Sequence, residues 1–338
     1  MHGIRTALVA FAAALVLLSQ GAFAQSLTVA LFERYLDPLR IQAGIPGMSA
    51  AIVQGGRVVL KGGFGMADAE RSIPATEDTP YEIADVTQTF GATLVLQLIE
   101  RGRFDLVDRI QRWTPLIPQS QATIGQVLTH TSTGTFFYDP SRFAALTEVV
   151  EYYNQRPFSK VLADEILDRL VMSDTVPGRN VISPTGGERS FFDERTIARY
   201  GAVLQRAAIP YRVDVRGRAT RTERPQRGAS ARANAATGIV STVLDLAKFD
   251  AALDDNLLLE GHPLSNGWFV QTYNSQPLLW KFGLEPRAYS SLILKVPRRD
   301  LTLILLANSD GLSATFNLQT GDVLTSPFAR LFLRAFVG

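Results

Sequence analysis

The sequence predicts an α+β fold in which an antiparallel β-sheet, built from both ends of the chain and flanked by helices, carries a mainly helical inserted lobe. Short β-rich runs occur near the N-terminus and again in the last third of the 338 residues, and the region between them has helical apolar spacing. This order of elements suggests one sheet assembled from the two termini. We therefore expect an α/β lobe of about residues 25–84 and 236–338, a helical lobe of about residues 85–235, and a cleft between them.

The N-terminal residues have the pattern of a secretory signal peptide. Arg5 precedes the apolar run TALVAFAAALVLL, and the small-residue pattern Ala22-Phe23-Ala24 predicts cleavage before Gln25. The run is shorter than the ~20 residues that a spanning helix needs, so a membrane anchor is the weaker interpretation. We expect residues 1–24 to be removed and residues 25–338 to be exported, periplasmic or secreted, with no membrane span.

The mature chain begins with a helix and a β-hairpin. The runs MSAAIVQ and RVVLKGGF surround Gly55-Gly56, a two-residue hairpin signal. Before them, residues 27–43 have the apolar spacing of a helix that packs on a sheet, at Leu27, Ala30, Leu31, Tyr35 and Leu39.

Helical patterns fill the middle of the chain, and strands return after it. We expect helices at 89–102, 124–130, 142–155, 159–171 and 194–206, and another that begins after Ser241 or Thr242. The later strands are GWFVQTYN, PLLWKF, YSSLILKV and DLTLILLAN, with turns at 274–276 and 297–299. An amphipathic helix at about 322–336 closes the chain.

Composition excludes several classes of site. The sequence has no cysteine, which rules out disulfides, a thiolate nucleophile and sulfur-ligated zinc. Its three histidines, His2, His130 and His262, are far apart, which argues against a histidine-rich metal site, and we expect no cofactor. A formal net charge of +2 gives no argument for nucleic acid as a partner.

The stretch from Tyr81 to Leu98, YEIADVTQTFGATLVLQL, starts an apolar helix with an acid and an amide three residues apart. By itself, Asp85-x-x-Gln88 is a capping-box pattern, in which the aspartate accepts from the backbone N–H of residue 88 and the glutamine reaches back. We favour this structural interpretation over a catalytic role for Asp85.

The same stretch resembles the nucleophile helix of serine β-lactamase and penicillin-binding-protein-like hydrolases. Thr79-Pro80-Tyr81 leads into it and Thr89-Phe90 follows, so that Asp85 stands at the position of the family's serine and Gln88 at that of its lysine. A serine hydroxyl and a lysine amine one turn apart let the amine take the hydroxyl proton. An amide does not accept a proton in this way.

Other segments extend the resemblance over essentially the whole mature chain. Tyr138 matches the tyrosine of the family's second motif, where Pro140 replaces an asparagine, and Lys281 and Gly283 match the third motif. By this resemblance, the backbone N–H groups of Asp85 and Leu284 are the oxyanion donors and the fold is β-lactamase/transpeptidase-like. The remaining matching segments are Ile45-Pro46-Gly47, VLTHTS at 127–132, ILDRLVMSDTVPG at 166–178, GIVST at 238–242 and LLANSDG at 305–311.

The degenerate positions predict a catalytically inactive homologue that retains a cleft for a small-molecule or peptidoglycan-like ligand, or for a partner. If Lys281 faces Asp85, the ammonium and the carboxylate can pair across the site. One alternative is an active esterase, peptidase or β-lactamase-like hydrolase with a displaced nucleophile, for which Ser132 and Ser290 are the candidates. Another is a structural secreted protein whose cleft has collapsed.

Two further features favour structural interpretations. His130 in THTS is most simply a buried or capping histidine in a turn. The segment 212–232 holds seven arginines with only Asp214 and Glu223, and we favour a solvated loop over a site for an anionic surface because it lacks interleaved aromatic residues.

Overall fold

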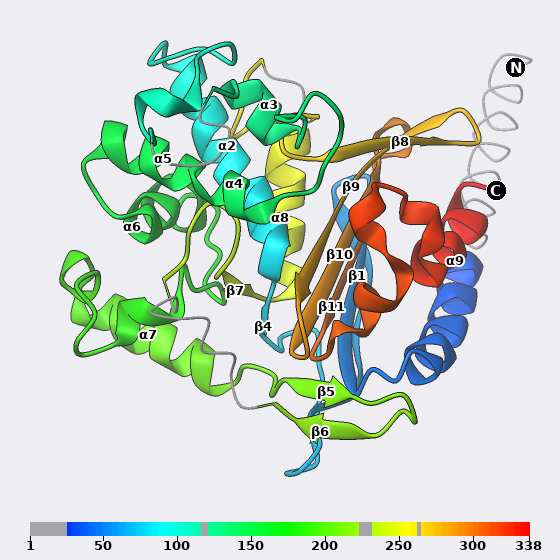
Figure 1. The fold of residues 1–338 in the computed structure, drawn as a ribbon. Helices are drawn as coiled ribbons and strands as arrows, with labels where there is room; N and C mark the ends of the chain where they lie inside the picture. The colour runs from blue at the N-terminus through cyan, green and yellow to red at the C-terminus, as the bar shows by residue number, and fades with distance from the viewer. Residues whose placement is uncertain (1–25, 116–120, 223–231, 262–264) are drawn as a thin grey trace, which may run out of the picture.

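The computed structural model describes residues 26–115, 121–222, 232–261 and 265–338. Its main element is a seven-stranded sheet in the order β3-β2-β1-β11-β10-β9-β8 (Figure 1). Every adjacent pair in it is antiparallel, and β1, near the start of the chain, pairs with β11, near its end. The predicted α+β class and the sheet built from both ends of the chain are confirmed. The strands are β1 Gly47–Gln54, β2 Arg57–Asp68, β3 Ile73–Pro74, β8 Phe269–Tyr273, β9 Gln276–Glu285, β10 Tyr289–Val296 and β11 Leu301–Ala307.

Two predicted hairpin turns are present. Gly55 and Gly56 join β1 to β2 with φ of 56° and 70°, values that a glycine adopts without steric cost. Asn274 and Ser275 join β8 to β9, also with positive φ. The predicted signal peptide and His262 lie outside the described residues.

The sheet is buried on both faces. Along β11, Leu303 and Leu305 pack with the N-terminal helix, residues 26–42, and with α9, Pro327–Phe336. The alternating Ile304 and Leu306 belong to the core on the other face, which α8, Val243–Asp254, and α2, Thr87–Glu100, cover (Figure 1).

The N-terminal helix packs on the sheet as predicted, but of the predicted apolar stripe only Leu39 packs against the core. Leu27, Leu31 and Tyr35 are 44–58% exposed, whereas Phe32 and Leu36 are buried against α9 and the sheet. Both sets have helical spacing, so the sequence pattern fits two stripes, and tertiary packing selects the one that carries the phenylalanine.

The helices of the middle of the chain agree with prediction in position but differ in length. The predicted helix 142–155 is divided into α4 and α5, and the closing helix begins at Pro327 because Ser326 caps it and proline suits the first helical position. The α-helices are α3 Ile124–Leu128, α4 Pro140–Ala144, α5 Leu146–Asn154, α6 Phe158–Leu162 and α7 Glu194–Gln205, and a π-helix covers Ala163–Leu167. The 3-10 helices are Ala84–Val86, Ile110–Arg112, Arg179–Ile182, Arg189–Phe191, Pro297–Arg299, Asp310–Leu312, Ala314–Phe316, Leu318–Thr320 and Val323–Thr325.

Two small strand pairs complete the fold. β4, Tyr81–Glu82, pairs with β7, Val240–Ser241, and β5, Tyr211–Val213, pairs with β6, Ala219–Arg221. The second pair lies within the predicted solvated loop, which is therefore partly a hairpin. In the ranges given above, no helix has the length and apolar character that crossing a membrane requires.

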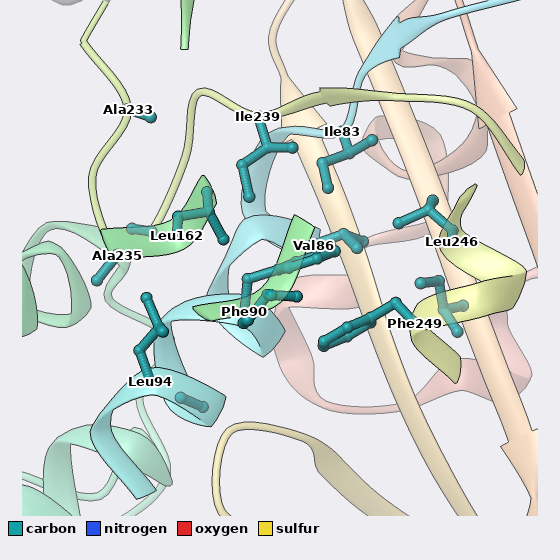
Figure 2. Packing of buried hydrophobic residues seen from close by; sticks show 14 of the residues in the cluster. Ile83, Val86, Phe90, Leu94, Leu162, Ala233, Ala235, Ile239, Leu246 and Phe249 are labelled. Carbon is teal, nitrogen blue, oxygen red and sulfur yellow. The ribbon is translucent and has the colours of Figure 1, made fainter. Parts of the chain in front are cut away.

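Apolar packing holds the start of α2. Ile83 and Val86 lie in one cluster with Ile239 and Leu246, and the rings of Phe90 and Phe249 stack with their centroids 3.9 Å apart (Figure 2). This cluster joins the first turn of α2 to α8 and thereby fixes the segment that carries residues 85–88.

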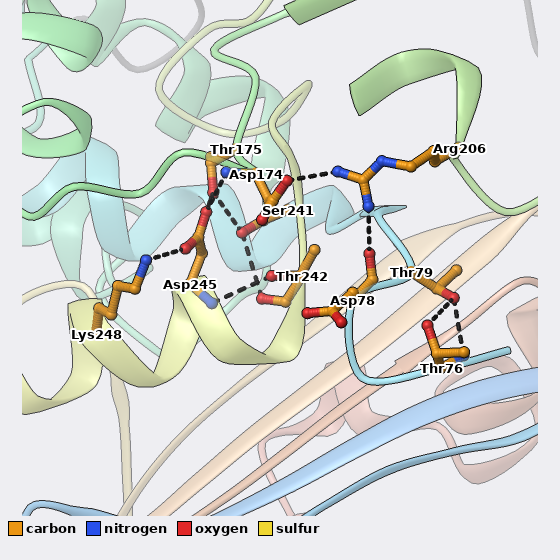
Figure 3. A network of polar contacts seen from close by, with 10 residues as sticks. All are labelled: Thr76, Asp78, Thr79, Asp174, Thr175, Arg206, Ser241, Thr242, Asp245 and Lys248. Atoms are coloured by element: carbon orange, nitrogen blue, oxygen red, sulfur yellow. Dashed lines mark hydrogen bonds and ion pairs between the residues drawn. The ribbon is translucent and has the colours of Figure 1, made fainter. Parts of the chain in front are cut away.

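A polar network ties the segment before α7 to α8. The Asp245 carboxylate accepts from the Asp174 backbone N–H at 2.8 Å and from Thr175 Oγ1 at 2.9 Å, and it pairs with Lys248 (Figure 3). Arg206, after α7, donates to the backbone oxygen of Asp78 and pairs with Asp174. Through Asp78, these contacts also brace the chain just before β4.

Candidate functional site

The chain makes a strained turn immediately before Asp85. Ala84 has φ of 47°, a left-handed conformation that costs an alanine ~1 kcal/mol or more. A 3-10 turn at Ala84–Val86 follows, and α2 begins at Thr87. Because the neighbouring Ile83 and Val86 are buried in the core, packing maintains this turn and directs the side chain of residue 85 away from the core.

Gly283 lets β9 lie directly against that turn. A Cβ atom at position 283 would lie 2.3 Å from the backbone oxygen of Ile83 and 2.3 Å from Ser291 Oγ. Only glycine therefore permits this approach. As the resemblance implies, the first turn before α2 and the 281–284 segment come together, and the backbone N–H of Leu284 donates to Asp85 Oδ2 at 3.1 Å.

The predicted capping box is not formed. The N-cap of α2 is Val86, and this cap has no side-chain hydrogen bond. The Asp85 carboxylate instead accepts from β9, and the Gln88 side chain contacts His130 and Tyr138. The 3-10 turn shifts the N-cap by one residue, from Asp85 to Val86, so that Asp85 is no longer in the position from which a capping side chain acts.

The hydrogen bonds around His130 determine its tautomer. The backbone N–H of Asp139 donates to His130 Nδ1 at 3.2 Å, so Nδ1 carries no proton and Nε2 does in the neutral ring. Nε2 then donates to Gln88 Oε1 at 3.0 Å, which orients the amide. Gln88 Nε2 is left to donate to the Tyr138 oxygen at 3.3 Å.

The chain of hydrogen bonds ends at Asp85. The Tyr138 hydroxyl bonds to the Asp85 carboxylate. Burial, the charge of Asp85 and this bond together hold the pKa of Tyr138 well above its usual range. We call His130, Gln88, Tyr138 and Asp85 the buried polar chain. The other three members each donate toward the Asp85 carboxylate.

Lys281 lies beside the buried polar chain in an aromatic cage. The lysine is fully buried, and its ammonium lies 4.3 Å from the ring centroid of Phe269, 5.4 Å from that of Phe143 and 5.9 Å from that of Tyr138. Burial lowers the pKa of Lys281 to about 7, and the charge of Asp85 acts in the opposite direction. The ion pair between Lys281 and Asp85 that the sequence suggests stays a prediction.

Lys281 is also in contact with His130. The Lys281 Nζ lies 3.5 Å from His130 Nε2, the nitrogen that carries the imidazole proton. Burial, with the nearby charges of Lys281 and Arg142, lowers the pKa of His130 to about 2. His130 therefore stays neutral at physiological pH, as expected for a buried histidine, and it is also part of the site, which sequence reasoning missed.

The two candidate displaced nucleophiles have structural contacts. Ser290 is buried on β10, where its hydroxyl donates to the backbone oxygen of Ser309 at 2.6 Å and accepts from the Leu312 N–H at 3.0 Å. Ser132 accepts from the Arg142 guanidinium. Pro140 is the first residue of α4, so the position of the family's asparagine forms a helix start.

A pocket adjoins the aromatic cage through Phe269. It has a volume of about 450 Å³, and Phe269 contributes both to its wall and to the cage around Lys281. Asp85, Gln88 and Lys281 do not line it. Its lining comprises Thr129, Phe136, Ser265, Trp268, Phe269, Val270, Thr320 and Gly321. The described part of the chain contains no group of acidic and histidine side chains that could hold a metal ion.

Sequence reasoning also missed the aromatic cage. Phe269 belongs to β8 and is the cross-strand partner of Trp280, next to Lys281, so a correct strand register would have placed the ring near the lysine. Nothing local to the sequence indicates Phe143, which comes from α4.

Comparisons with known proteins identify what the chain resembles. The model of the Beta-lactamase family matches residues 31–321. Protein flp of Staphylococcus aureus is 35% identical over 94 residues, which are 26% of this chain and 19% of that protein. A Beta-lactamase of Providencia stuartii is 30% identical over 147 residues, 43% of this chain and 37% of the relative. These alignments cover well under half of each curated relative.

Solved structures show the same fold. The octameric penicillin-binding protein homologue from Pyrococcus abyssi superposes with a TM-score of 0.70 at 18% identity, over 90% of this chain and 77% of that one. The D-amino acid amidase from Ochrobactrum anthropi SV3, solved with L-phenylalanine amide, superposes with a TM-score of 0.67 at 20% identity, over 90% and 98% of the two chains.

Proposed function

Because this chain belongs to the Beta-lactamase family, we propose that it is an exported, catalytically inactive relative of serine hydrolases that acts by binding a ligand or a partner. One observation carries the proposal. At the helix start where acyl transfer needs a hydroxyl beside an amine, the Asp85 carboxylate accepts from the Leu284 N–H and the Gln88 amide is hydrogen-bonded to His130 and Tyr138.

The chemistry of these groups opposes acyl transfer. Attack by a carboxylate on an ester or amide would give an anhydride, and the Gln88 amide cannot accept the proton that an amine would take. Loss of the nucleophile from such a unit removes several powers of ten in rate. A substrate carbonyl would also have to displace the charge-assisted bond between Leu284 and Asp85, at a cost of ~1.5–3 kcal/mol.

The pocket of about 450 Å³ supports the binding half of the proposal. Its aromatic walls at Phe136, Trp268 and Phe269 suit an apolar or aromatic group, and the hydroxyls of Thr129 and Ser265 can fix its orientation. A small amphipathic molecule, such as an aromatic amino acid derivative or a peptidoglycan-like fragment, is the class of ligand that we propose.

Export is the remaining part of the proposal. It rests on the charged start, the short apolar run and the small-residue pattern Ala22-Phe23-Ala24, which together are typical of a cleaved secretory signal. Detection of the mature chain beginning at Gln25 outside the cytoplasm would test it.

Covalent labelling tests the inactivity. The wild-type protein and the double variant Asp85→Ser/Gln88→Lys are incubated with a fluorescent penicillin and with a fluorophosphonate, and bound label is read on a denaturing gel. We expect no label on the wild type and label on the double variant, because the variant restores a hydroxyl beside an amine on a helix held by the same core. Asp85→Ser alone is the matched control, since it has the hydroxyl without the amine.

Each other outcome has a definite meaning. Labelling of the wild type would show a displaced nucleophile and would refute the inactivity. A folded double variant that stays unlabelled would show that Pro140 or closure of the centre also blocks the reaction, and would contradict the retention of the family's site geometry. Circular dichroism of each variant separates these outcomes from misfolding.

A further inference from the structure

The β5–β6 hairpin is a basic projection with a rigid base. The backbone N–H of Tyr211 donates to the Asn308 oxygen at 2.8 Å, and the buried Tyr211 hydroxyl accepts from the Ala69 N–H at 2.8 Å. Arg221, opposite Tyr211 in the register, pairs with Glu70 at 2.9 Å. The hairpin therefore leaves the sheet from a fixed position, at the lower edge of the molecule in Figure 1.

The tip of the hairpin presents unpaired positive charge. Arg212, Arg216 and Arg218 are exposed, and within the described ranges no carboxylate pairs with any of them. Asp214 Oδ1 accepts from the backbone N–H groups of Arg216 and Arg218, which shapes the turn. The tip carries three arginines against this one aspartate, a net charge of +2.

An apolar side chain stands at the apex between the arginines. Val215 is fully exposed, with a relative accessibility of 104%, so none of the described residues covers its side chain. A pocket of about 550 Å³ lies beneath the tip and is partly apolar. Val213 and Val215 line it from the hairpin, and Leu39 and Phe316 line it from the rest of the fold. Arg330 also lines this pocket.

We propose that the β5–β6 hairpin docks the protein on an anionic phospholipid bilayer, with Arg212, Arg216 and Arg218 at the lipid phosphates and Val215 among the headgroups. A soluble polyanion would satisfy the arginines but would leave the apex valine in water, whereas a bilayer interface accommodates both. Each arginine near an anionic surface strengthens binding about fivefold. Contact through so few residues is weak, reversible and sensitive to salt.

Vesicle sedimentation of the whole protein tests this assignment. We expect binding to vesicles of equal phosphatidylglycerol and phosphatidylcholine, no binding to pure phosphatidylcholine, and loss of binding as NaCl rises from about 50 to 500 mM. The variant Arg216→Gln/Arg218→Gln should lower the partition coefficient about 25-fold. Arg57→Gln/Arg103→Gln, which removes two exposed arginines elsewhere, should leave it unchanged.

Insertion of the apex has its own readout. Val215→Trp should bind the mixed vesicles with a blue shift of tryptophan emission that the wild type lacks. Equal binding to both vesicle types, an equal loss in the Arg57/Arg103 control, or binding without a blue shift would each overturn the proposal. Binding to soluble polyphosphate in place of vesicles would identify a free polyanion as the partner and would also overturn it.

Discussion

Gln88→Met tests whether the buried polar chain stabilises the fold as its geometry indicates. Methionine has a similar volume to glutamine but provides neither the oxygen that accepts from His130 at 3.0 Å nor the N–H that donates to Tyr138 at 3.3 Å. The His130 Nε2–H is then left buried with only the Lys281 Nζ nearby, at 3.5 Å, which is too long for a good hydrogen bond. An unsatisfied buried donor costs ~1–3 kcal/mol, and the longer bond to Tyr138 contributes ~0.5–1 kcal/mol, so we expect a destabilisation of about 2–4 kcal/mol.

The same helix offers a matched control. Gln97 is also buried on α2, and its Nε2 donates to the backbone oxygen of Leu258 at 3.0 Å. Its Oε1 has no hydrogen-bond partner among the described residues, so Gln97→Met removes an unpaired oxygen along with one hydrogen bond. We expect a cost of no more than about 1 kcal/mol.

Urea unfolding, followed by circular dichroism and tryptophan fluorescence, measures both variants. Coincident transitions by the two probes and an unchanged dependence on denaturant allow the midpoints to be converted into free energies. If Gln88→Met proved no more destabilising than Gln97→Met, the hydrogen bonds of the buried polar chain would contribute nothing beyond ordinary burial, and the tautomer derived for His130 would have to be abandoned.

Three further predictions concern the same site. Lys281→Met should stabilise the protein by up to about 4 kcal/mol at pH 7, because burial lowers the pKa of the lysine and each pKa unit corresponds to about 1.4 kcal/mol. Since the folded pKa is lowered to about 7 from 10.5, the unfolded chain binds more protons between these values, and the gain in unfolding free energy should shrink as the pH is raised toward 10.5. The pKa of His130 is about 2 in the folded protein and 6.5 in the unfolded chain, so the free energy of unfolding falls on acidification below about pH 6.5. His130→Asn should reduce the slope of the unfolding free energy against pH by about 1.4 kcal/mol per pH unit. An unchanged slope would show that other groups cause it. Gly283→Ala should lower the free energy of unfolding by about 3 kcal/mol or more, through the clash with the Ile83 oxygen. The control Gly201→Ala, with open space around its Cβ, should not destabilise the fold. Equal urea midpoints for the two variants would disprove the close approach of β9.

Much of the fold follows from local sequence patterns. The Gly55-Gly56 turn and the strands at both ends of the chain were predictable because turn residues and β-rich runs act over a few residues. The buried stripe of the first helix was not predictable, since two stripes have the same spacing and only contact with α9 selects Phe32 and Leu36. The capping box failed for a related reason, because core packing of Ile83 and Val86 stabilises a 3-10 turn that local propensity does not indicate.

The sequence by itself determined which chemical groups stand at the start of α2. Asp85 and Gln88 are a carboxylate and an amide in any conformation, so the absence of a hydroxyl and an amine at those positions needed no structure. Only the tertiary structure decided their partners: His130 lies 42 residues from Gln88, and the Leu284 N–H lies 199 residues from Asp85. Hydrogen bonds between such distant segments depend on how the sheet and helices pack, because no local pattern encodes the approach of β9 to the turn before α2.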